Sequence, residues 1–329
     1  MTICWKRWLA VLMLLSSPSQ HALAEPEQRV VLWDLEYSAT EMKYGVEASV
    51  FAIGDPVHET ITLHALIGAG LLKPGSSKND PPAVNFLRGV FWNDDPCADL
   101  FRDKRSLKPS SGVAWYKDFW NADHEADPKK FGDLECRLLG RSHFGNLQFL
   151  HGMANADGED PSVTRSALLA WARYAYNLAI GVTSPDTTLR AAQAPIADVG
   201  DMAPLELFKA PNFTVISERA IGSLAHLLQD SYARGHVRRQ ETPHGSVGAI
   251  EQFHSYAHQN HDKHKQDDMW RTGGTDLEKI RGVRGGTEAL AESTALFKFY
   301  ASKTAWPTVE KYLLLGPLRF ADKTYRAEP

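Results

Sequence analysis

Several features that assign a chain to a particular class are missing or scarce in this sequence. The 329 residues contain only 3 cysteines, and they show no repeats or low-complexity tracts. No apolar run approaches the roughly 20 residues that a membrane-spanning helix needs, so we expect no transmembrane anchor. Basic residues do not exceed acidic ones, 36 against 40, so there is no general attraction to nucleic acid. With 43% hydrophobic residues, the chain can bury one large core.

The first 24 residues have the pattern of a secretory signal peptide. Lys6 and Arg7 precede an apolar run at 8–15, and the sequence ALA at 22–24 is a cleavage signal. Cleavage removes two positive charges and no acidic residue, so the formal net charge changes from −4 to −6. We therefore expect a signal peptide at 1–24 and a single secreted or periplasmic domain at 25–329.

Cleavage of the signal peptide also determines which cysteines remain in the mature chain. Cys4 is lost with the signal peptide, which leaves Cys97 and Cys136 as an even pair. In an oxidising compartment, this pair can form a disulfide between the segment around Asp94 and the segment before His143. Two buried free thiols are the alternative.

Hydrophobic periodicity predicts a helical protein. Alternation typical of a strand is confined to 29–32, and loops rich in Pro, Gly, Asp and Ser lie at 73–82 and 184–204. We predict an all-α fold with one multi-helical domain. Its helices are expected at 58–72, 163–180, 215–233, 247–268 and 287–300.

The most informative segment is 221–236, in which His226, Asp230 and His236 follow one another. Positions four apart lie on the same face of a helix, so His226 and Asp230 can point at a common ion. Gly235 favours a helix end, which lets His236 fold back beside the same cavity. Imidazole nitrogen and carboxylate oxygen together suit zinc. A hydrogen-bonded surface pair is the alternative for such a spacing when it occurs alone.

A second cluster of histidines lies in 247–268. His258 and Asp262 repeat the four-residue spacing, with His254, His261 and His264 beside them. Apolar residues recur along the same segment, which favours a half-buried helix over a solvated metal-binding tract. Two helices that each offer paired ligands predict a site with more than one metal ion.

Other ligand types occur upstream. His143 and His151 lie in RSHFGNLQFLHGMA, Asp94 and Asp95 in FWNDDP, and His58 in GDPVHETITLHAL. Each signal is weak alone. His64, on roughly the opposite helix face from His58, is expected to be an ordinary core or surface residue.

In this order, the motifs resemble those of the zinc-dependent phospholipases C and of the single-strand-specific nucleases that share their fold. In that superfamily a His that opens a helix, an Asp, a His, His-x3-Asp-x5-His and a final His-x3-Asp or His-x3-Glu hold three zinc ions. HETI at His58, WNDDP at Asp94, FLHGMA around His151 and QDSYARGH around Asp230 are most similar to the bacterial zinc metallophospholipases C. The resemblance spans about 55 to 262, and the His-Asp-His spacing is its specific part.

The resemblance implies which residues hold metal. One zinc would be bound by His151, His226 and Asp230, and a second by His236, His258 and Asp262. Asp230 would also bridge to a third zinc bound by His58. Three alternative ligands remain in this assignment: His143 in place of His151, and His254 or His261 in place of His258.

The resemblance leaves the count at two or three zinc ions. Family members usually begin the mature chain with a Trp whose amino and carbonyl groups bind the third zinc. Here the expected new N-terminus is Glu25, and the residues just before His58 supply no such Trp. Trp33 could serve only after a further cut.

The resemblance implies a secreted phospholipase C that acts on phospholipid at a membrane surface. It would hydrolyse the glycerol-side phosphodiester bond, preferably of phosphatidylcholine, to diacylglycerol and a phosphorylated head group, and no obligate protein partner is evident. Asp94 would be the acidic residue beside the attacking water, with Asp95 as the alternative. Phe91 and Trp92 could bind a choline head group by cation–π attraction of roughly 0.5 to 2 kcal/mol, with core packing as the alternative.

Two other functions remain. A nuclease of the same fold would take nucleic acid as its partner, and it needs aromatic platforms and a positive groove; Arg234, Arg238 and Arg239 are the only basic cluster near the motif. A noncatalytic metal-binding helical protein, di-iron or purely structural, is the other. A di-iron bundle needs two helical Glu-x-x-His motifs, but only Glu251-x-x-His254 fits because the other contains Pro243. A zinc protease is disfavoured because Thr62 stands where HExxH needs its second His.

Overall fold

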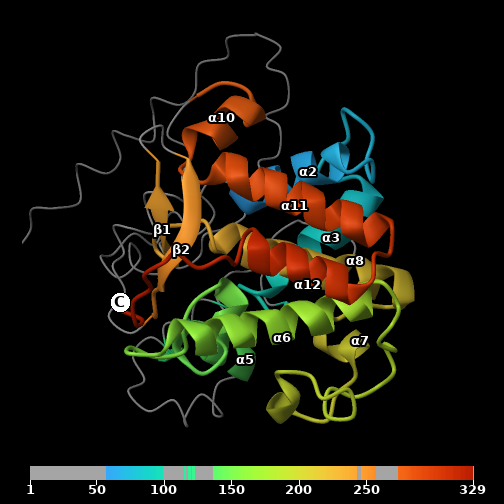
Figure 1. The fold of residues 1–329 in the computed structure, drawn as a ribbon. Coiled ribbons are helices and arrows are strands. Elements are labelled where there is room, and N and C mark those ends of the chain that lie inside the picture. Colours follow the sequence, from blue (N-terminus) through green and yellow to red (C-terminus); the bar gives the residue numbers. More distant parts are fainter. Residues whose placement is uncertain are drawn as a thin grey trace, which may run out of the picture. The chain divides into compact units, whose positions relative to one another are not determined.

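The computed structural model describes residues 57–98, 115, 118–119, 121–122, 136–242, 246–256 and 273–328. All of them belong to the compact unit Val31–Pro329. The described part is mostly helical, as predicted, but it also contains a two-stranded sheet (Figure 1). None of its helices is both long enough and apolar enough to cross a membrane. The expected signal peptide and the expected strand at 29–32 lie outside the described residues.

Four of the predicted helices are found within a few residues of their expected ends. They are α2 (Val57–Gly68), α6 (Pro161–Ala179), α8 (Phe213–Asp230) and α11 (Gly286–Ala301). Two of them begin at side-chain caps, because the Asp160 carboxylate accepts from the Ser162 backbone N–H and the Asn212 side chain accepts from that of Val215.

Several short helices were missed. They are α3 (Pro81–Trp92), α5 (Arg137–Phe144), η2 (Gln148–His151), η3 (Ala197–Val199), α7 (Pro204–Leu207), α10 (Asp276–Gly282) and α12 (Trp306–Leu315). Helices α3, α7 and α12 carry proline in their first turn. Proline is tolerated there because the first-turn N–H groups have no partner within the helix, so it marks a helix start as well as a loop.

The prediction of a helix at 247–268 is wrong for residues 247–253, which form a strand. Strand β2 (Val247–Phe253) pairs antiparallel with β1 (Val237–Glu241), with Val237 opposite Phe253 and irregularities within the ladder (Figure 1). The C-terminal segment extends this pairing, since the Ile250 N–H donates to the carbonyl of Arg319 over 2.8 Å. Strand β1, which directly precedes it in the chain, and the C-terminal segment therefore decide the conformation of a segment whose apolar spacing resembles a helix. Residues 257–268 lie outside the described part.

Helix α8 is buried along nearly its whole length and crosses α3 at unusually close range. A Cβ atom on Gly222 would lie 2.2 Å from the carbonyl oxygen of Phe86, and one on Gly89 would lie 2.1 Å from that of Arg219. Only glycine lets the two backbones approach this closely. The crossing places Asn93, at the end of α3, beside Ser223 of α8, and the Ser223 hydroxyl donates to the Asn93 side chain over 2.6 Å.

A disulfide joins Cys97, three residues after Asp94, to Cys136 at the start of α5. Replacing both cysteines by serine should lower the free energy of unfolding by about 2 to 4 kcal/mol, because a cross-link over 39 residues restricts the unfolded chain. Denaturant unfolding without reductant measures the effect. Reduced wild-type protein is the control and should unfold at the same midpoint as the double variant. An unchanged midpoint in the variant would contradict a stabilising cross-link.

Candidate metal centre

The last turn of α8 supplies the first two site residues. His226 and Asp230, both buried, face the same way, and His226 Nε2 lies 2.8 Å from Asp230 Oδ2. This is the arrangement that the four-residue spacing predicted. The helix ends at Asp230, before the predicted stop at Gly235, and a turn then leads back to His236.

His151 reaches the same point from the short helix η2. Gly152 follows it in the left-handed conformation, at φ 70°, and a Cβ there would lie 3.3 Å from the backbone nitrogen of Ser231. The glycine thus lets η2 pack closely against the end of α8. His151 Nδ1 lies 3.2 Å from Asp230 Oδ2 and 3.3 Å from His226 Nε2.

Asp94 arrives from the end of α3. Its Oδ1 atom lies 3.7 Å from both His151 Nδ1 and His226 Nε2. Its backbone is fixed by Trp115, whose indole N–H donates to the Asp94 carbonyl over 2.9 Å. Asp95 is also buried, but it belongs to neither ligand group found among the described residues. The structure therefore places Asp94 against His151 and His226.

Four atoms from three parts of the chain thus converge. They are Asp94 Oδ1, His151 Nδ1, His226 Nε2 and Asp230 Oδ2. The separations given above between pairs of these atoms run from 2.8 to 3.7 Å. Asp94, His151 and His226 make up one group of ligand atoms that lie within 4.8 Å of one another, and Asp230 Oδ2 contacts the two histidines from outside that group.

Hydrogen bonding shows why this cluster fits a cation. His151 Nε2 lies 3.1 Å from the carbonyl oxygen of Asn93, which can only accept, so Nε2 carries the proton and Nδ1 carries the lone pair. That lone pair faces Asp230 Oδ2, another acceptor, at 3.2 Å. A positive charge is needed between them, either a second proton or a metal ion. The further ligand atoms of Asp94 and His226 beside this pair favour the metal ion.

A second position adjoins the first. His58, in the first turn of α2, places Nε2 3.1 Å from Asp230 Oδ1, and its ring stacks on that of His226 with centroids 4.6 Å apart. His58, His226 and Asp230 form a second group whose ligand atoms lie within 4.8 Å of one another. Asp230 thus directs one carboxylate oxygen to each position, as expected of a bridging ligand.

The charge states of the buried residues also suit a metal ion. Burial lowers the pKa of His226 to about 3, so its ring is neutral at physiological pH. Burial alone would raise the pKa of Asp230, but the imidazoles of His226, His236 and His58 outweigh it, and the pKa lies well below its usual value. Neutral imidazole and ionised carboxylate are the forms that coordinate metals.

His143 packs behind the cluster and is in neither ligand group. Its ring centroid lies 4.6 Å from that of His151, and its Nδ1–H donates to the carbonyl of Leu139 over 2.9 Å. Burial, followed by repulsion from His151, lowers the pKa of His143 well below its usual value. Of the two alternatives left open by the sequence, the structure brings His151 to the centre.

His236 lies next to the cluster, whereas the ring of His254 faces the C-terminal segment, with Nδ1 3.1 Å from the carbonyl oxygen of Glu328. His236 Nδ1 donates to the carbonyl of His151 over 2.7 Å and lies 3.8 Å from Asp230 Oδ2. The pairing of β1 with β2 brings in His254, whose backbone N–H donates to the carbonyl of His236 over 2.8 Å. His258, His261 and Asp262, the other ligands expected here, lie outside the described residues.

Phe91 and Trp92, for which the sequence left open a choline-binding face or core packing, are both buried. Trp92 is 4% exposed; its ring stacks on Trp171, and its N–H donates to the carbonyl of Leu207 over 3.0 Å. Phe91 is likewise buried. Trp92 is therefore a core residue, which was the alternative, because α3 turns it toward α6 while Asp94 follows beyond the helix end.

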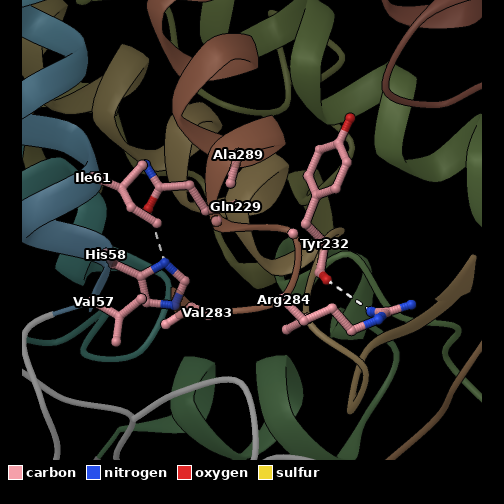
Figure 2. A pocket seen from close by; sticks show the side chains of 11 residues that line it. Val57, His58, Ile61, Gln229, Tyr232, Val283, Arg284 and Ala289 are labelled. Carbon is pink, nitrogen blue, oxygen red and sulfur yellow. Dashed lines mark hydrogen bonds between the residues drawn. The ribbon is translucent and has the colours of Figure 1, made fainter. Parts of the chain in front are cut away.

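Sequence reasoning missed the polar residues that support the cluster. Asn93 accepts a hydrogen bond from His151 at its backbone carbonyl and one from Ser223 at its side-chain oxygen. Gln229 accepts a hydrogen bond from His58 (Figure 2). A pocket beside His58 is lined by Gln229, Tyr232 and Arg284, and there the Arg284 guanidinium donates to the Tyr232 carbonyl (Figure 2). No local pattern marks these residues, because their partners come from other helices. His64, as expected, lies apart from the site and pairs with Asp276 at 3.5 Å.

Comparisons with protein-family models, with curated proteins and with solved structures find no match for this chain.

Proposed function

We propose that this chain is a zinc-dependent phosphoric diester hydrolase, a phospholipase C that cleaves the glycerol-side phosphodiester bond of phospholipids. The observation that carries the proposal is the double position around Asp230, whose two oxygens face His58 on one side and His151 and His226 on the other. Adjacent metal ions that share one carboxylate are typical of enzymes that hydrolyse phosphate esters.

The ligand geometry supports zinc. Tetrahedral zinc with N and O ligands at about 2.0 to 2.1 Å has ligand atoms roughly 3.3 to 3.4 Å apart, and the separations around His226 and Asp230 run from 2.8 to 3.7 Å. Calcium and magnesium prefer sites made of oxygen alone. A di-iron site needs helical Glu-x-x-His motifs. The motif Glu251-x-x-His254 is not helical, because Glu251 lies on strand β2 and His254 directly follows the strand.

Each residue then has a defined task. Asp94, His151, His226 and Asp230 would hold one zinc, and His58 and Asp230 would contribute to a second. Zinc ions bound there would supply Lewis acidity, which polarises the phosphate and lowers the pKa of water toward about 7. Asp94 is both a ligand and the carboxylate that we assign to orienting the attacking water and accepting its proton. Ligands for a third ion would come from His236, His258 and Asp262, with His254 and His261 as alternatives.

The surroundings of Arg234, Arg238 and Arg239 favour a lipid substrate over a nucleic acid. Arg239 is buried and donates to the carbonyls of Ser231 and Pro317. Arg238 pairs with Glu251 at 3.4 Å, and Arg234 lies 3.9 Å from Glu241. A strand-binding groove needs accessible positive charge, and this cluster supplies little of it.

Export through a signal peptide at 1–24, with a secreted or periplasmic location, belongs to the same proposal. The disulfide between Cys97 and Cys136 supports it, since disulfides persist in oxidising compartments. Preference for phosphatidylcholine now rests on the family resemblance and the acidic charge balance, because Trp92 is part of the core.

Zinc-loaded mature protein should hydrolyse phosphatidylcholine vesicles to diacylglycerol and phosphocholine, and it should cleave single-stranded DNA slowly or not at all. Rates on both substrates, measured with one preparation and paired with metal analysis, test this. Chelation should abolish the activity and added zinc should restore it. Faster hydrolysis of DNA would overturn the phospholipase assignment and leave the metal site intact. Less than one zinc per active chain would overturn the metal site as well.

A further inference from the structure

Gln229 is a buried polar residue at the interface of three helices. It precedes Asp230 on α8, is 3% exposed, and faces α2 and α11. Its amide nitrogen lies 2.9 Å from the Thr62 hydroxyl of α2 and 3.2 Å from the Ser293 hydroxyl of α11. Its amide oxygen lies 2.9 Å from His58 Nδ1 (Figure 2).

The orientation of this amide decides the tautomer of His58. With the nitrogen donating to the two hydroxyls, the oxygen can only accept, so His58 Nδ1 must carry the proton. The lone pair of the neutral ring then lies on Nε2, the atom 3.1 Å from Asp230 Oδ1. With the amide reversed, its nitrogen would donate to Nδ1 and the proton would lie on Nε2, which could then not coordinate a metal ion.

A purely structural role explains this residue poorly. A leucine of similar size would fill the space without the cost of burying an amide. Thr62 and Ser293 do not require Gln229 either, because helical Ser and Thr hydroxyls can donate to a carbonyl one turn earlier in their own helix. What a leucine at this position would remove is the acceptor for His58 Nδ1.

We propose that Gln229 is a positioning residue: its amide oxygen keeps the proton of His58 on Nδ1 and so presents Nε2 to a metal ion beside Asp230. The proposal rests on the metal-binding part of the proposed function. Residues that hold the second ring nitrogen of a ligating histidine typically contribute 10- to 100-fold to metal affinity.

The test replaces Gln229 in two ways. Gln229→Leu removes the acceptor and should weaken zinc at the His58 position about 10- to 100-fold. Gln229→Glu keeps an acceptor and should bind zinc there at least as tightly as wild type. Calorimetric titration of metal-free protein with zinc gives the number of ions and their affinities, and His58→Ala identifies the transition that belongs to this position.

Nitrogen-15 NMR of metal-free protein labelled at histidine provides a readout independent of metal and activity. His58 should be protonated on Nδ1 in wild type and in Gln229→Glu. Protonation on Nε2 in wild type would overturn the proposal, and so would equal zinc affinity of wild type and Gln229→Leu.

A matched control separates positioning from loss of a buried amide. Gln252 is fully buried on β2 and donates to the Arg326 carbonyl. Gln252→Leu should lower thermal stability as much as Gln229→Leu and leave zinc at the His58 position unchanged. Equal loss of zinc in both variants, or in Gln229→Glu and Gln229→Leu, would show a structural role only. Wild type that binds no zinc would instead refute the proposed function.

Discussion

Asp230→Asn should remove zinc from both positions of the cluster and lower phospholipase activity far more than the 10- to 100-fold expected for loss of a supporting residue. The physical reason is that Asp230 gives Oδ1 to the His58 position and Oδ2 to the His151 and His226 position. An asparagine has the same shape but only one oxygen, without charge, so its NH₂ group must face one of the two positions. Metal analysis and rates on phosphatidylcholine vesicles measure the effect.

Asp198→Asn is the matched control for this experiment. Asp198 is an accessible carboxylate that pairs with Arg141 on α5, and its replacement should leave zinc content and rate close to wild type. Circular dichroism of the metal-free proteins checks that both variants fold. Retention of zinc at both the His58 position and the His151 and His226 position by Asp230→Asn, or activity within tenfold of wild type, would contradict a ligand shared between two positions.

The sequence predicted those parts of the site that depend on local geometry. His226 and Asp230 share a helix face because four residues complete about one turn, and the amphipathic pattern of 215–233 located α8 within a few residues. The choice between His143 and His151 could not be made in this way. It depends on a single 3₁₀ turn and on Gly152, which together press η2 against the end of α8.

Sequence-based prediction failed where contacts made outside a segment decide its structure. The apolar spacing of 247–253 fits a helix, but β1 and the C-terminal segment offer strand partners, and β2 forms instead. Trp92 is adjacent to the site in sequence, yet α3 directs it into the core against Trp171. Gln229 was overlooked because its partners, His58, Thr62 and Ser293, come from other helices.

Gly222→Ala should destabilise the protein by about 3 kcal/mol, although alanine is the better helix former by about 1 kcal/mol. The added Cβ would lie 2.2 Å from the Phe86 carbonyl oxygen and 2.9 Å from the Gly89 Cα. Both are backbone atoms, so no side-chain rotation relieves the overlap and α3 must move away from α8. Denaturant unfolding measures the loss. Gly273→Ala, which meets no atom within 4 Å, should change stability by less than about 0.5 kcal/mol.

The same substitution should also weaken metal binding, because Asp94 reaches the cluster from the end of α3, whereas His226 and Asp230 belong to α8. Separating the helices draws Asp94 Oδ1 away from His226 Nε2 and strains the bonds between Asn93 and Ser223. Leu313→Ala, in the core on α12, should cost a similar 2 to 5 kcal/mol without this effect. At equal loss of stability, Gly222→Ala should therefore bind zinc more weakly than Leu313→Ala in calorimetric titration. Equal affinities would show that the crossing supports the fold and does not position Asp94.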